Sequence, residues 1–398
     1  MRLWHPLAAA ALILSATPGC SADAGKAATT PLAKPVAAKR AAAPRDNFAV
    51  LAGKLRNASR APVRIVQLGD SHTAADLFSG ELRTLLQARY GDGGIGLVPA
   101  SAVPGIRNDR VIIDSPPRQW QLVSARNQQS DQFPLGGYLS LPQGERSSVS
   151  LRARNTDDAQ RYRVSALYRA SGSASVWLAG GQRRSLPATQ GQWRVSPALG
   201  NLALPLQMSV QKPDGLSLGG WYLQSQKNAG VIYSTLGING ARLDVVDKWQ
   251  PGWQDSLKAL RPDLLIFAYG TNEAFDDTLD LALYESQMDA TLTRLRRDMP
   301  QSAILLVGPP DSIKQRRASS CAARQPQPLA AVVRIQRQLA RKHHAQFWDW
   351  QGYMGGPCSI SRWQTQGLAR PDLVHLTADG YRQSANALFS FLKGPLGM

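Results

Sequence analysis

The second half of the chain alternates between two spacings of its apolar residues. Short apolar runs of strand length are separated by longer segments in which apolar residues recur every three or four positions, as on one face of a helix. The strand-like runs cover 231–236, 264–269 and 304–307. The helical segments cover 249–260, 279–297, 329–341 and 378–392. This alternation predicts a doubly wound parallel sheet with functional groups at the carboxyl ends of its strands.

The first half of the chain contains one more unit of this kind, followed by a region of different texture. A short helix is expected over 47–56, a strand over 63–68, and a second helix carries the leucines from 77 to 86. From 103 to 226, short alternating stretches are separated by Gly, Pro, Ser and Gln, which favours an antiparallel sandwich or jelly roll. The sequence therefore predicts an α/β domain at 47–102 and 227–398, interrupted by a β-sandwich domain at 103–226.

The N-terminus has the layout of an export signal. A basic start is followed by an apolar stretch from 7 to 16 and by small residues that lead to Cys20, so we expect 1–20 to be a signal peptide. Residues 21–46 are mostly Ala, Lys, Pro and Thr and form the predicted disordered linker. The mature chain is then expected in the periplasm.

Cys20 ends a Thr-Pro-Gly-Cys sequence that resembles a bacterial lipobox. Lipidation of Cys20, which would anchor the chain to the outer membrane, and ordinary signal cleavage nearby both stay open. The chain has three cysteines, and without Cys20 the remaining pair is Cys321 and Cys358. An oxidising periplasm favours a disulfide between this pair, with two partly buried thiols as the alternative.

The net charge of the chain indicates which classes of molecule it could bind. Its 398 residues carry a formal net charge of +18, which suits a polyanionic cell envelope or an anionic glycan. Nucleic acid is the usual partner of so basic a protein, but export argues against it. The basic residues are scattered rather than clustered, so a charged surface that only aids solubility also fits.

Three short polar sequences fall where predicted strands end. They are Gly-Asp-Ser-His at 69–72, Gly-Ile-Asn-Gly at 237–240 and Gly-Thr-Asn-Glu at 270–273. Each alone is typical of a turn or a helix cap. Ser71 is nevertheless placed on a strand-to-helix turn, where a hydroxyl is exposed beside backbone N–H groups that could stabilise an oxyanion.

A serine nucleophile needs a base within hydrogen-bond reach, and the base needs a carboxylate that orients it. The five histidines are His5, His72, His343, His344 and His375. His5 is lost with the signal, the pair at 343–344 is expected on a basic surface, and the side chain of His72 diverges from that of its neighbour Ser71. His375 remains as the candidate base, with Asp372 three residues earlier as its partner.

Together with Asp-Leu-Val-His at 372–375, the three motifs resemble blocks I, II, III and V of the SGNH hydrolases, also called GDSL esterases and lipases. The resemblance implies a catalytic triad of Ser71, His375 and Asp372. It also implies an oxyanion hole made by the backbone N–H of Ser71, the backbone N–H of Gly240 and the side-chain amide of Asn272. No metal or organic cofactor is expected.

The chain departs from the family pattern at two positions. Glu273 stands where block III usually has Asp, which could alter how the oxyanion loop is supported. His72 stands where block I usually has Leu, and packing or support of the site is favoured over contact with substrate. Gly240 rather than Gly237 is assigned to the oxyanion hole because it aligns with the last glycine of block II.

The stretches 69–76 and 89–96 resemble bacterial peptidoglycan O-acetylesterases, which carry a β-rich, carbohydrate-binding-module-like domain between blocks I and II. This implies an esterase that removes acetyl from the 6-hydroxyl of N-acetylmuramic acid in peptidoglycan or a related envelope glycan. An O-acetyltransferase with the same triad and a catalytically silent wall-binding protein are the alternatives. Five aromatic residues could bind sugars or, as is favoured for each, fill the core: Trp120, Trp177, Trp193, Trp221 and Tyr222.

Overall fold

The computed structural model describes residues 46–128, 133–155, 159–249 and 253–398, all within one compact unit, Pro44–Met398. The predicted signal peptide, its Cys20 and the linker up to residue 45 lie outside the described residues. In the part of the chain that is described, no helix is both long and apolar enough to cross a membrane.

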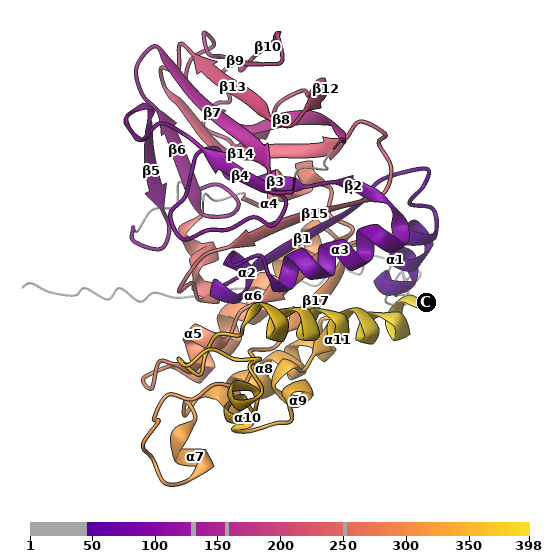
Figure 1. Cartoon of the computed structure of the whole chain (residues 1–398), viewed down its shortest axis with the longest axis vertical. Coiled ribbons are helices and arrows are strands. Elements are labelled where there is room, and N and C mark those ends of the chain that lie inside the picture. Colours follow the sequence, from indigo (N-terminus) through magenta and orange to yellow (C-terminus); the bar gives the residue numbers. More distant parts are fainter. Residues whose placement is uncertain (1–45, 129–132, 156–158, 250–252) are drawn as a thin grey trace, which may run out of the picture. The chain divides into compact units, whose positions relative to one another are not determined.

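A sheet of six parallel strands forms the centre of the α/β domain (Figure 1). Its strand order is β18-β17-β16-β1-β15-β2. The strands are β1 (Val63–Gly69), β2 (Asp92–Gly94), β15 (Val231–Gly237), β16 (Leu264–Ala268), β17 (Ala303–Val307) and β18 (Gln346–Trp348). The chain builds one side of β1 with β2 and β15 and then the other side with β16, β17 and β18. This confirms the predicted doubly wound fold.

Helices cover both faces of this sheet, because side chains alternate along each strand. In β1, Ile65 belongs to one apolar core and Val66 and Leu68 belong to the other. The first core also contains α1 (Asn47–Arg56), α3 (Phe78–Tyr90) and α11 (Ala378–Leu396), and α3 packs against α11 (Figure 1). The second contains α4 (Trp253–Leu260), α6 (Leu281–Asp298) and α8 (Leu329–Lys342).

The inserted region consists of two antiparallel sheets. One has the order β10-β9-β13-β7-β4, and the other has the order β11-β8-β14-β6-β5, with β12 paired to β8 and β3 paired to β14. The strands are β3 (Gly96–Val98), β4 (Val111–Asp114), β5 (Trp120–Ser124), β6 (Tyr138–Pro142), β7 (Arg146–Ala153), β8 (Arg161–Ala170), β9 (Val176–Ala179), β10 (Gln182–Ser185), β11 (Arg194–Val195), β12 (Leu199–Ala203), β13 (Leu206–Gln211) and β14 (Leu216–Ser225). Leu151 and Met208 of the first sheet share one core with Val164 and Trp221 of the second, as in a sandwich.

Antiparallel pairing begins earlier than the boundary at residue 103 that the sequence suggested. β3 pairs with β14 of the inserted domain, whereas β2, two residues before it, belongs to the parallel sheet. Gly94 and Gly96 both have a positive φ, so the chain changes direction between two very short strands. Strands of three residues carry no readable periodicity.

The aromatic residues considered as sugar platforms fill cores instead. Each is less than a tenth exposed: Trp120, Trp177, Trp193, Trp221 and Tyr222. The rings of Trp177 and Trp221 are in contact inside the sandwich, at a centroid distance of 5.2 Å and an interplanar angle of 41°. The interpretation of these rings as core residues is therefore confirmed.

Candidate active site

The three strand-end motifs leave the sheet from three adjacent strands, β16, β1 and β15. Gly69 at the end of β1 is level with Gly237 of β15 and with Ala268 of β16. A side chain at Gly237 would meet the backbone nitrogen of Ala74 at 2.2 Å. The absence of that side chain allows the segment after β1 to pack directly on the end of β15.

Ser71 is the first residue of a short helix, α2 (Ser71–Ala74). Asp70 caps this helix, because its Oδ1 accepts the N–H of His72 at 3.0 Å. The N–H of Ser71 is thereby left at the free N-terminal end of the helix, where intrahelical acceptors are absent. This is the position that an oxyanion donor requires.

His375 reaches Ser71 from a loop that precedes α11. The Oγ of Ser71 lies 2.9 Å from Nε2 of His375, and Nδ1 of His375 lies 2.9 Å from Oδ2 of Asp372. The other carboxylate oxygen of Asp372 accepts the N–H groups of Val374 and His375 at 3.0 and 2.9 Å. The structure thus brings the three predicted triad residues together in one hydrogen-bonded chain.

The electrostatics of Asp372 suit an orienting carboxylate. Partial burial raises its pKa, but the hydrogen bonds from the N–H groups of His375 and Val374 and from the imidazole outweigh burial. The pKa of Asp372 therefore lies below its usual value, and the group is ionised at neutral pH. An ionised Asp372 favours the tautomer with the proton on Nδ1 of His375, which leaves Nε2 free to accept the proton of Ser71.

The other two predicted oxyanion donors come from neighbouring segments. Asn272 lies in the short helix α5 (Thr271–Ala274), and its Nδ2 donates to the carbonyl of Ala241 at 2.8 Å. This bond turns the amide nitrogen toward the 238–242 loop and leaves it one further hydrogen. Gly240 has a φ of +75°, and no acceptor among the described residues takes its N–H. Both groups can still donate to a ligand.

Glu273 of α5 connects this helix to the segment that follows Gly240. Its carboxylate is 1% exposed, and Oε1 accepts the N–H of Leu243 at 2.8 Å. Arg242 pairs with Asp276 at 2.8 Å in the same interface. Where the family usually has Asp, this chain therefore uses a longer side chain to hold the Gly240 loop against α5.

Burial of Glu273 raises its pKa to about 7. Asp70, also buried, has a pKa raised to about 7 by burial and, to a lesser extent, by the charge of Glu273. Two buried carboxyl groups with raised pKa values thus lie next to the site, Asp70 beside Ser71 and Glu273 beside Asn272. Each follows the end of one of two neighbouring strands, β1 and β16.

Replacement of Glu273 by Gln should flatten the dependence of stability on pH. Because the pKa of Glu273 is raised by folding, the free energy of unfolding of the parent protein should fall from about pH 4.5 to 7. The variant should still lose stability over that range, because Asp70 contributes in the same way. Its loss should be smaller than that of the parent by on the order of 1 kcal/mol. Urea unfolding at pH 5 and pH 8 measures the difference. Asp247→Asn, at a half-exposed carboxylate nearby, is the control, and equal losses in E273Q and the parent would contradict the interpretation.

His72 lies behind the triad and not in it. Its ring is buried, its Nδ1 lies 2.8 Å from the hydroxyl of Tyr381, and its centroid is 5.3 Å from that of His375. Burial first, and then the nearby His375, lower its pKa to about 3, so the ring is neutral. These contacts favour the interpretation of His72 as packing that supports His375.

The two remaining described histidines lie at the end of α8, and the structure does not bring them to the site. His343 was expected on the surface, but it is buried, and its Nε2 lies 2.6 Å from Oδ1 of Asp289. The partner of this ring is a carboxylate on α6, which is distant in the sequence. The basic residues next to His343 therefore did not predict that it is buried.

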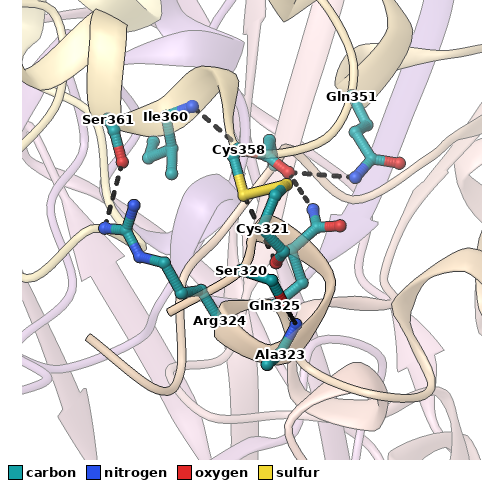
Figure 2. Close-up of a disulfide and its surroundings, with 10 residues drawn as sticks. Ser320, Cys321, Ala323, Arg324, Gln325, Gln351, Cys358, Ile360 and Ser361 are labelled. Carbon is teal, nitrogen blue, oxygen red and sulfur yellow. Dashed lines mark hydrogen bonds between the residues drawn. A yellow bond between two sulfur atoms is a disulfide. The ribbon is translucent and has the colours of Figure 1, made fainter. Parts of the chain in front are cut away.

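A disulfide joins Cys321 and Cys358, the pair favoured by the cysteine count (Figure 2). Beside it, the buried carboxylate of Asp311 accepts the side-chain amide of Gln351 at 3.0 Å and the N–H of Ile360 at 2.9 Å. The disulfide and this carboxylate fasten the long loop after β17 to the segment from 350 to 365.

The same loop contacts both halves of the site. The N–H of Ile313 donates to the carbonyl of Leu373, in the loop that contains Asp372 and His375, at 2.9 Å. The Nζ of Lys314 donates to the carbonyl of Phe275, just after α5, at 2.7 Å. Asp311 and Lys314 were not predicted as site residues, since neither lies in a motif and their role depends on contacts between distant segments.

Comparisons with known proteins cover both domains. Residues 93–207 match a family model described as "Peptidoglycan O-acetylesterase, N-terminal", and residues 214–383 match the "GDSL-like Lipase/Acylhydrolase family". Asp372 and His375 fall within the second match, whereas Ser71 precedes both. No curated protein matches the chain.

Among solved structures, the chain is similar to "Peptidoglycan O-acetylesterase in action, 5 min", with 33% identity over 88% of this chain and 97% of that one and a TM-score of 0.79. An acetyl xylan esterase, AlAXEase, matches 42% of this chain and 82% of its own, with 18% identity and a TM-score of 0.33. Axe2, an acetylxylan esterase from Geobacillus stearothermophilus, matches 43% of this chain and 74% of its own, with 17% identity and a TM-score of 0.32.

Proposed function

The chain belongs to the family of peptidoglycan O-acetylesterases, and on that premise we propose that it hydrolyses the 6-O-acetyl ester of N-acetylmuramic acid in peptidoglycan. It is a carboxylic ester hydrolase that removes O-acetyl groups from this polymer. The observation that carries the proposal is the chain of hydrogen bonds from Ser71 through His375 to Asp372 on this fold.

In the proposed first half-reaction, Ser71 becomes acetylated. Nε2 of His375 takes the proton of the Ser71 hydroxyl while Oγ attacks the acetyl carbonyl carbon. The oxyanion that forms accepts hydrogen bonds from the N–H of Ser71, the N–H of Gly240 and the amide of Asn272, and loss of one such donor typically costs about 3–4 kcal/mol. Collapse of this intermediate breaks the bond to the sugar oxygen, which leaves with the proton from His375.

In the second half-reaction, water replaces the sugar hydroxyl. His375 takes a proton from water, whose oxygen attacks the acetyl group on Ser71. The same oxyanion donors stabilise the second tetrahedral intermediate. Its collapse releases acetate and returns the proton to Ser71 Oγ, so that the enzyme is restored.

Its place of action is part of the proposal. The signal-like pattern of residues 1–20 supports export to the periplasm, where peptidoglycan lies. Attachment of a lipid to Cys20 stays a prediction from the lipobox-like sequence.

Acetate release from defined polymers tests the proposal. The protein should release acetate from O-acetylated peptidoglycan faster than from acetylated xylan or another acetylated polysaccharide, and the product should be the free 6-hydroxyl. Mass spectrometry of muropeptides and an acetate assay follow both products. Preference for another polymer would overturn the substrate, and transfer of acetyl to an added glycan in place of acetate release would overturn hydrolysis.

A further inference from the structure

One short turn of the inserted domain lies against the end of the parallel sheet that carries the active site. This turn follows β5, and its Ala125 is fully buried in the core that also contains Ile238 of the oxyanion loop. The N–H of Ala125 donates to the carbonyl of Gly137 at 2.9 Å, and Lys248 donates to the carbonyl of Ala125 at 2.9 Å. Three segments thus hold the turn in place.

Arg126, the next residue, points back toward the oxyanion glycine. A methyl group built on Gly240 would lie 3.9 Å from Nε of Arg126. Burial raises the pKa of Tyr138, and the positive charge of Arg126 offsets part of this rise. The hydroxyl of Tyr138 donates to the carbonyl of Gly237 at 3.4 Å. The short distance to Gly240 places Arg126 beside the 237–240 segment, and its charge acts on Tyr138, which contacts the same segment.

Arg126 is available to a ligand. The residue is exposed, and no carboxylate among the described residues forms an ion pair with it. Arginines elsewhere in the domain have such partners, for example Arg107 with Asp109 and Arg152 with Asp114. A guanidinium that has no acid partner among the described residues, at the edge of an active site, can bind an anion, because its fork of N–H groups matches a carboxylate.

We propose that Arg126 is a substrate-binding residue that recognises a carboxylate on the acetylated muramyl unit while its ester lies at Ser71. The proposal rests on the function proposed above. The acetyl ester is neutral, but the same sugar carries a lactyl group that ends in a carboxylate or continues into a peptide with carboxylates of its own. Recognition of this charge would distinguish peptidoglycan from neutral acetylated polysaccharides.

The expected role is in binding and not in the chemical step. Arg126 is exposed and therefore hydrated, so its field at a developing oxyanion is weakened by solvent compared with the fixed N–H donors of the site. Loss of Arg126 should raise KM for an anionic substrate and leave kcat almost unchanged. The turnover of a small neutral ester should not change.

Kinetics of three variants on three substrates test this. For Arg126→Ala, kcat/KM should fall about tenfold on an O-acetylated muropeptide, mainly through KM, and should be unchanged on p-nitrophenyl acetate. Arg126→Lys should retain part of the preference, and Arg126→Glu should lose more than Arg126→Ala. O-acetylated glycan stripped of its peptides separates the two sources of charge, since sensitivity to Arg126 persists there only if the lactyl carboxylate is the group bound.

The exposed Arg118→Ala in the same domain is the matched control and should behave as the parent. Added salt should reduce the kcat/KM of the parent on the muropeptide more than that of Arg126→Ala. Equal losses on the muropeptide and p-nitrophenyl acetate, or no loss on either anionic substrate, would overturn the proposal. If the parent cleaves p-nitrophenyl acetate but neither peptidoglycan substrate, the proposed substrate fails instead, so the two failures are distinguishable.

Discussion

Ser71→Ala is expected to abolish acetate release from O-acetylated peptidoglycan, with a fall in kcat of roughly 10⁶. The reason is chemical: alanine has no oxygen to form the acetyl-enzyme, so only the oxyanion donors and binding contacts remain. Binding of the polymer should persist, because the variant removes one atom that lies at 2.9 Å from His375. Acetate release and sedimentation with insoluble peptidoglycan measure the two effects separately.

Ser59→Ala is a matched control for this variant. Ser59 is exposed and precedes β1, whereas Ser71 follows it, so the two serines lie toward opposite ends of this strand. Both variants should unfold at the same urea concentration as the parent, within the small range usual for surface positions. A serine-directed fluorophosphonate should label the parent and Ser59→Ala but not Ser71→Ala. Acetate release by Ser71→Ala at the parent rate would remove the serine from the mechanism.

The parallel sheet and its active edge could be predicted because their signals are local. The apolar runs at 231–236 and 264–269 were long enough to indicate strands. A motif that directly follows a strand in the sequence must lie at the carboxyl end of that strand. Ser71 and His375 could be selected because one lies at a strand end and the other was left by elimination. The structure adds the distances that bring these segments together.

The interior of the site could not be predicted in the same way. The bond from Leu243 to Glu273 and the approach of Arg126 to Gly240 join segments that are far apart in the sequence, and periodicity contains no information on such pairs. The three-residue strand β18 lacks a readable period. His343 is buried because it has a partner on α6, so the basic residues beside it in the sequence led to the wrong prediction of a surface position.

Asp372→Asn is expected to lower kcat by about 10⁴ while leaving KM nearly unchanged. The amide oxygen of Asn could still accept the N–H groups of Val374 and His375, which keeps the loop in place. Its NH₂ group would then face Nδ1 of His375, where the parent has a carboxylate oxygen at 2.9 Å. The imidazole would have to accept that hydrogen bond and carry its own proton on Nε2, so it could not take the proton of Ser71.

The low pKa of Asp372 makes this prediction sharper, because the parent carboxylate stays ionised throughout the neutral range and the variant differs from it by one full charge. Asp379→Asn is the matched control. Asp379 lies in the first turn of α11, four residues from His375, and its exposed carboxylate pairs with Arg382. This control variant should keep the parent kcat. Steady-state kinetics on the O-acetylated muropeptide decide the matter, since a loss of less than tenfold in Asp372→Asn would mean that the Nδ1 proton of His375 is set by something other than this carboxylate.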